Sequence, residues 1–64
     1  MDGADAHSVD EFCKAHRLGR STFYKLLREG HGPAIMRVGT RLLVSREAAA
    51  AWRRKMEEES ERAA

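Results

Sequence analysis

The segment Leu18-Gly19-Arg20-Ser21-Thr22-Phe23-Tyr24-Lys25-Leu26-Leu27 carries the pattern on which the fold prediction rests. Phe23, Leu26 and Leu27 recur at i, i+3 and i+4, and this spacing predicts the buried face of a short helix. On a helix of about 100° per residue, the opposite face carries polar, aromatic and cationic side chains, namely Ser21, Tyr24, Lys25 and Arg28. The segment therefore predicts a helix that packs on a core with one side and presents hydrogen-bonding and positive groups on the other.

The boundaries of this helix and of the one before it have recognisable signals. Ser21 is expected to cap a helix from Thr22 to about Glu29, with Gly30 ending it. Upstream, Ser8-Val9-Asp10-Glu11 matches a capping box and predicts a first helix from Val9 to about His16, with Val9, Phe12 and Cys13 buried. Gly19, in the turn between them, is free to adopt a positive φ. Two short helices joined by a tight turn form a helix-turn-helix unit.

A β-hairpin is predicted after the connector His31-Gly32-Pro33. The β-prone runs 34–38 and 41–44 surround Gly39-Thr40, and Gly39 suits the first position of a type II′ turn. One face of the hairpin must pack on the helices, because an isolated hairpin is marginal in water. The side chains expected to face inward are Met36, Val38, Leu42 and Val44, with Arg37 and Arg41 beside the tip and in solvent.

A third helix is predicted from Arg46 to about Glu59, capped by Ser45. Its inward stripe is Ala49, Trp52 and Met56, with Trp52 as the main core aromatic. The acidic run 57–61 opposes the helix dipole, so fraying is expected there. The prediction is thus a mainly helical α+β winged helix-turn-helix over residues 8–58, with a two-stranded wing, a flexible tail over 1–7 and a frayed acidic tail over 59–64.

Positive charge is concentrated in the middle of the chain. Residues 14–46 hold one acid, Glu29, and eight basic residues, a net charge of +7, whereas the two flanks together have a net charge of −5. Such a basic centre is the expected footprint of a surface that binds a polyanion, the alternative being a solvated basic surface. The eight basic residues are Lys14, Arg17, Arg20, Lys25, Arg28, Arg37, Arg41 and Arg46.

Composition argues against several other classes of protein. Sixty-four residues leave room for one domain with a marginal core. Cys13 is the lone cysteine, and with neither a signal peptide nor a membrane span in the sequence we expect a cytoplasmic protein without membrane contact. Cys13, His16 and His31 lack the fourth ligand of a closed zinc site, so neither metal nor other cofactor is expected. No nucleophile, base and oxyanion donor share a pocket, so we do not expect an enzyme.

The run from Ser8 to Trp52 resembles the small MerR-like winged helix-turn-helix modules found in excisionases and AlpA-like phage regulators. The resemblance rests on the order and spacing of four pieces, 8–12, 18–26, 37–41 and 45–48 leading to Trp52. It implies that the second helix enters the major groove of DNA while the hairpin wing contacts backbone or minor groove. It also implies a bacterial or phage protein on the nucleoid. The chain ends before the dimerisation helix and effector domain of full-length MerR regulators, so no small-molecule effector is expected.

Carried over by position, the resemblance implies a set of DNA-contacting residues. Arg20 and Lys25 are expected at guanine edges or at phosphates, Tyr24 at a phosphate or shielding the first helix, and Ser21 at a phosphate as well as at the cap. Arg46 is a weaker phosphate candidate. The recognition set is Arg20, Ser21, Thr22, Tyr24, Lys25 and Arg28, and the wing set is Arg37, Thr40 and Arg41.

The expected function is sequence-specific binding of double-stranded DNA. The protein would serve as a recombination directionality factor or a small transcriptional regulator of a mobile element, with several copies bound side by side and an integrase as a candidate partner. The alternative is an adaptor that docks on a recombinase, polymerase or packaging enzyme through its third helix. In that helix the run Arg53-Arg54-Lys55 faces Glu57-Glu58-Glu59 at i, i+4 spacing, which also fits a solvated face.

Overall fold

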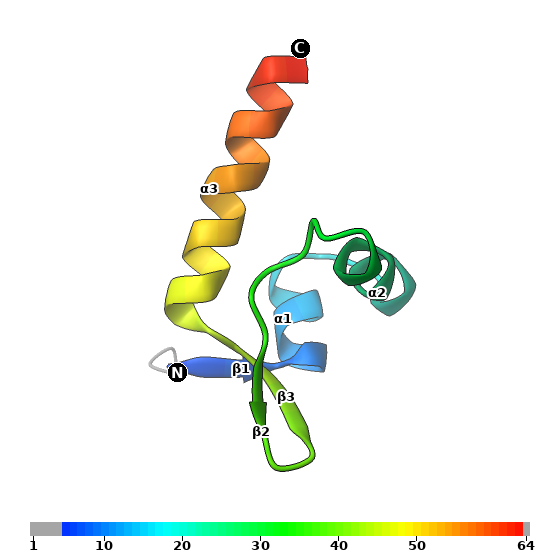
Figure 1. Ribbon diagram of the computed structural model, residues 1–64, viewed down its shortest axis with the longest axis vertical. Coiled ribbons are helices and arrows are strands. Elements are labelled where there is room, and N and C mark those ends of the chain that lie inside the picture. The colour runs from blue at the N-terminus through cyan, green and yellow to red at the C-terminus, as the bar shows by residue number, and fades with distance from the viewer. Residues whose placement is uncertain (1–4, 64) are drawn as a thin grey trace.

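A three-stranded antiparallel sheet and three helices make up the computed structural model, which describes residues 5–63 (Figure 1). The strand order is β1-β3-β2. The predicted mainly helical α+β class is confirmed. In chain order the elements are β1 (Ala6–Ser8), α1 (Val9–Ala15), α2 (Arg20–Arg28), β2 (Met36–Val38), β3 (Arg41–Ser45) and α3 (Arg46–Ala63).

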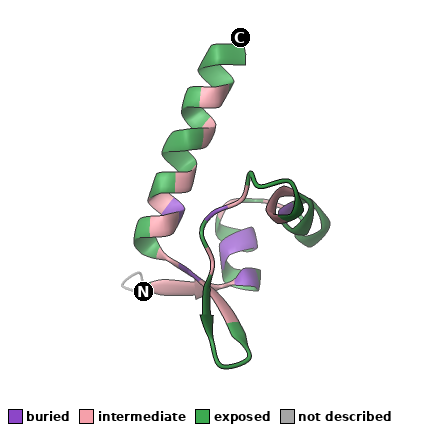
Figure 2. Ribbon diagram, in the orientation of Figure 1, coloured by how far each residue is buried: buried purple, intermediate pink, exposed green. Residues whose placement is uncertain are grey.

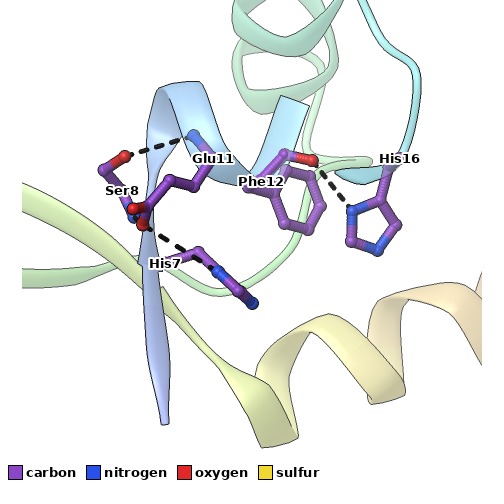
Figure 3. Close-up of polar contacts among 5 residues, drawn as sticks. All are labelled: His7, Ser8, Glu11, Phe12 and His16. Atoms are coloured by element: carbon purple, nitrogen blue, oxygen red, sulfur yellow. Dashed lines mark hydrogen bonds and ion pairs between the residues drawn. The ribbon is translucent and has the colours of Figure 1, made fainter. Parts of the chain in front are cut away.

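Helix α1 begins at the predicted capping box. The Ser8 hydroxyl accepts from the Glu11 N–H at 3.1 Å, and the Glu11 carboxylate accepts from the Ser8 N–H at 2.9 Å. Figure 3 shows the bond from the Glu11 N–H to the Ser8 hydroxyl, and His7, whose Nδ1 lies 3.9 Å from the Glu11 carboxylate. Val9, Phe12 and Cys13 are buried, as the spacing predicted. Local hydrogen bonds and one apolar stripe therefore fix both the start and the orientation of α1.

The turn after α1 places its positive φ at Arg17 rather than at Gly19. Arg17 has φ 56°, and Gly19, predicted to be the flexible residue, is an extended N-cap with φ −75°. The Leu18 N–H donates to the Cys13 carbonyl at 2.9 Å and the Arg17 N–H to the Lys14 carbonyl at 3.3 Å. These two bonds form a Schellman motif, which requires the left-handed residue immediately after the C-cap His16.

Helix α2 starts earlier than predicted. It runs from Arg20 to Arg28 with Gly19 as its N-cap, so the prediction that Ser21 caps it is wrong. Its C-terminal end agrees with the sequence, since Gly30 has φ +78° and closes a second Schellman motif. Phe23 is fully buried and Leu27 packs on the core, as predicted, whereas Leu26 is half-buried and not part of the core cluster.

The hairpin has the predicted turn but a different inward face. Val38 pairs with Arg41 across Gly39-Thr40, and Gly39 has φ +61°. Residues opposite one another in an antiparallel pair share a face, so Met36 lies with Leu43, and Val38 with Arg41. Val44 is fully buried and Leu42 packs on the core, as predicted. Met36 and Val38 are 40% and 52% exposed, so the prediction that they face inward is wrong.

A third strand, β1, lies in the segment predicted to be a flexible tail. His7 pairs with Val44 and Ser8 with Leu43, and the Arg46 N–H donates to the Asp5 carbonyl at 2.8 Å. The predicted two-stranded wing is thus the outer part of a three-stranded sheet. Residues 1–4 of the predicted tail lie outside the described residues.

Helix α3 is capped as predicted but is longer than expected. The Ser45 hydroxyl accepts from the Ala48 N–H at 3.0 Å, and the helix then continues to Ala63. The helix thus extends beyond its predicted end at about Glu59, which agrees with the strong helix propensity of Glu, Arg and Ala. Fraying of its acidic end stays a prediction. Residue 64 lies outside the described part. Figure 1 shows the C-terminal half of α3 extending away from the sheet and the other two helices. None of the helices in residues 5–63 combines the length and apolar character needed to cross a bilayer.

The core lies where α1, α2 and α3 meet β3 (Figure 2). Phe12 and Phe23 are fully buried, with ring centroids 5.5 Å apart. Trp52, predicted as the main core aromatic, lies at the rim instead. Its ring meets Phe12 edge-on at 5.4 Å, and its indole N–H donates to the His31 carbonyl at 2.8 Å. Trp52 therefore ties α3 and the connector to the core, whereas Met56, also predicted inward, is not part of the core cluster.

Candidate nucleic-acid interface

An open groove separates helix α2 from the hairpin. Arg20 and Tyr24, one helical turn apart, form the α2 wall, and Thr40 and Arg41 belong to the opposite wall. Four predicted site residues are thus brought together around one depression. The groove is lined by Ser8, Val9, Asp10, Arg20, Tyr24, Thr40, Arg41, Leu42 and Leu43.

The outward face of α2 continues from this groove as a stripe of exposed polar and cationic groups. Ser21, Thr22, Lys25 and Arg28 are all exposed. Within residues 5–63, neither Lys25 nor Arg28 lies within 4 Å of a carboxylate oxygen. The positive charges on this face are therefore available to an anion, and the start of α2 adds orphan backbone N–H groups because Gly19 provides no side-chain cap.

Arg20 is the one cation of α2 with a carboxylate partner in the described part of the chain. Its Nη1 lies 3.0 Å from Asp10 Oδ1, which bridges the first residue of α2 and the first turn of α1. Both side chains are exposed, at 61% and 65%. A hydrogen bond with Tyr24 is the main cause that raises the pKa of Arg20 above its ordinary value, and the Asp10 charge raises it further. The guanidinium is thus held at the groove wall in its charged form.

The two hairpin arginines point to opposite faces of the sheet. Arg37 pairs with Leu42 and so shares the face of the core-packed strand residues, whereas Arg41 pairs with Val38 on the outer face. Both are exposed, and no carboxylate of residues 5–63 lies within 4 Å of either. The hairpin therefore presents one cation on each side of its tip, with Thr40 between them in the turn.

Arg46 is not brought together with the other predicted residues. It is the first residue of α3, at the end of β3 opposite the hairpin tip, and its guanidinium lies 3.6 Å from Asp5 Oδ1. The same residue also donates its backbone N–H to the Asp5 carbonyl. Arg46 thus attaches β1 to the start of α3. It contributes neither to the lining of the groove nor to the exposed face of α2.

Sequence inspection missed Asp10 as a site residue. Its carboxylate lies in the first turn of α1, where the helix dipole favours a negative charge. This local role is sufficient to explain an acidic residue at this position of the sequence. Only the turn between α1 and α2 brings Asp10 within reach of Arg20, ten positions later. Ser8 and Leu43 also line the groove, through the β1–β3 pairing that the sequence did not predict.

Of the three residues weighed as zinc ligands, Cys13 lies in the core and His16 has other partners. Cys13 is buried, and its burial raises the pKa of the thiol. His16 donates from Nδ1 to the Phe12 carbonyl at 2.9 Å (Figure 3), which leaves Nε2 to accept from Arg53 Nη1 at 3.0 Å. Within residues 5–63, no three His, Cys, Asp or Glu side chains come together as a metal site would require.

Comparison with known proteins gave no match. No family model, no curated protein and no solved structure matched this chain. Its function has to be inferred from the residues and from their geometry.

Proposed function

We propose that this chain is a winged helix-turn-helix protein that binds double-stranded DNA in a sequence-dependent manner. Helix α2 enters the major groove, and the β2–β3 hairpin lies as a wing along the backbone or the minor groove. The observation that carries the proposal is the cationic surface on α2 and the hairpin tip, where Lys25, Arg28, Arg37 and Arg41 lack a carboxylate partner within the described residues.

The geometry of α2 supports this proposal. A helix of nine residues is about 13 Å long, and the major groove of B-DNA admits an α-helix. Phe23 anchors the inner side of α2 in the core, so its outer side chains are presented on a rigid support. Arginine and lysine are the residues that most often bond guanine edges and phosphates.

As the biological role we propose a recombination directionality factor or a small transcriptional regulator of a mobile element. A module of this size buries too little surface to bind one short site tightly, so several copies are expected to bind adjacent sites. A nucleoid location and an integrase as partner belong to the same proposal. Both roles require the same contacts with duplex DNA, which makes DNA binding the first property to test.

An adaptor function is the second candidate, and the projecting half of α3 favours it (Figure 1). In that case a protein partner would bind the exposed side chains of α3, among them Arg54 and Lys55. Helix α2 and the hairpin would then be dispensable for binding.

Two matched double variants separate these functions. Lys25→Ala/Arg28→Ala and Arg54→Ala/Lys55→Ala each remove one lysine and one arginine, all four exposed. Selection from a random duplex library with wild-type protein defines a site, and fluorescence anisotropy then measures each variant on it. We expect the α2 variant to lose at least tenfold in affinity and the α3 variant to retain it. Equal losses, or selection of no preferred sequence at moderate salt, would refute sequence-dependent binding through α2.

A further inference from the structure

The ion pair between Asp10 and Arg20 joins the two helices at the groove wall. Arg20 Nη1 and Asp10 Oδ1 are 3.0 Å apart, and both residues line the groove that faces the hairpin. Tyr24 lies one turn along α2 and lines the same groove. Arg20 is therefore held at the groove by a carboxylate of α1.

Fold stability gives little reason for this arrangement. Exposed ion pairs contribute little to stability, and both partners here are more than half exposed. Arg20 also occupies the first turn of α2, where the helix dipole disfavours a cation, and α2 has no acid in that turn. A cation in this position, with a partner supplied by another helix, indicates a role outside the fold itself.

The contacts of Arg20 leave part of its guanidinium unoccupied. The group is a planar fork of N–H donors, and a fork with a free edge matches the O6 and N7 acceptors of guanine. Asp10 engages the guanidinium, so its rotation is limited before any ligand arrives. Ordering a long side chain in advance lowers the entropic cost of binding.

We propose that Asp10 is a positioning residue that holds Arg20 in the orientation that bonds one guanine of the DNA site. The inference rests on the proposed function, and it adds that Arg20 selects a guanine in the DNA site. Asp10 itself acts through Arg20. The carboxylate also repels phosphates, so it sharpens base preference while reducing general affinity for DNA.

The test compares Asp10→Asn with Glu29→Gln, a variant that removes one exposed acidic charge at the C-cap of α2. Competition binding is measured on the selected site and on duplexes that carry each alternative base pair at each position. Asp10→Asn is expected to lower the preference for one guanine by roughly tenfold, within the range of a bidentate arginine contact. Arg20→Ala should remove the same preference, and the double variant should behave like Arg20→Ala. Glu29→Gln should raise affinity for all duplexes and leave every base preference intact.

Asp10→Ser places a smaller neutral side chain at the same position of α1 and also removes the ion pair with Arg20. It should weaken the same guanine preference, which gives a second measurement if Asp10→Asn does not fold. The inference is overturned if Asp10→Asn retains or strengthens the preference, since Asp10 would then merely mask Arg20, or if Glu29→Gln weakens it equally. The inference is also overturned if the wild type has base preferences but Arg20→Ala changes none of them. In that case the proposed function still stands. A wild type without any base preference refutes the proposed function itself.

Discussion

Replacing Arg41 with Gln tests whether the hairpin takes part in binding DNA. Arg41 lies at the first position of β3, exposed, and lines the groove opposite Arg20. No carboxylate of residues 5–63 lies within 4 Å of it, so its charge is not already neutralised by that part of the protein. The substitution leaves the core-packed strand residues Leu42 and Val44 unchanged.

The expected magnitude follows from the number of available cations. Lys25, Arg28, Arg37 and Arg41 have no carboxylate partner in the described part, while Arg20 is assigned to a base. If each of the four neutralises one phosphate, log affinity falls with log salt with a slope of about −3.6. Affinity then drops about 150-fold between roughly 50 and 200 mM salt. With Arg41→Gln the slope becomes about −2.7 and the drop about 40-fold.

Fluorescence anisotropy on a labelled duplex, repeated at several KCl concentrations, measures the slope. Arg54→Gln is the matched control, because Arg54 is exposed in the middle of α3, outside α2 and the hairpin, and should leave the slope unchanged. A wild-type slope shallower than about −2 would refute the assignment of the cationic surface. An unchanged slope for Arg41→Gln would refute the part given to the hairpin, as would an equal change for Arg54→Gln.

Three further predictions concern the fold and are checked by thermal unfolding or thiol chemistry. Arg17→Gly should stabilise the protein by up to about 1 kcal/mol, because glycine adopts φ 56° without strain; a lower Tm would contradict this. Ser45→Ala should cost about 1 kcal/mol through loss of the cap bond to the Ala48 N–H, and an unchanged Tm would show that the bond contributes nothing. The Cys13 thiol, buried and with a raised pKa, should react with a thiol reagent only after denaturation. Stability should be unaffected by this group below the ordinary thiol pKa and should fall as pH rises towards the native value; rapid reaction of the native protein would contradict both statements.

Local interactions made much of the fold predictable. The capping box of Ser8 and Glu11 spans three residues, and so does the cap bond from the Ala48 N–H to Ser45. The buried stripe of α1 and the glycine that ends α2 follow from helix geometry within one or two turns. Such features depend on neighbours along the chain, and the sequence displays those neighbours directly.

The inward face of the hairpin was also within reach of the sequence, and the prediction still failed. A two-residue turn at Gly39-Thr40 pairs Val38 with Arg41 and so places Met36 opposite Leu43. Leu42 and Val44 then share a face with Arg37, and Met36 and Val38 must lie on the other. An inward set of Met36, Val38, Leu42 and Val44 is therefore incompatible with a two-residue turn at Gly39-Thr40.

The sequence by itself determined the helix starts at Val9 and Arg46, the buried stripes and the concentration of positive charge, because each is a property of near neighbours or of composition. The tertiary structure alone decided that β1 pairs with β3, across 35 or more positions, from a segment without a β pattern. It also decided that Asp10 meets Arg20, since that contact depends on how the Schellman turn at Arg17 orients α2 against α1. Long-range pairing of this kind is fixed by packing and backbone geometry, which no local pattern encodes.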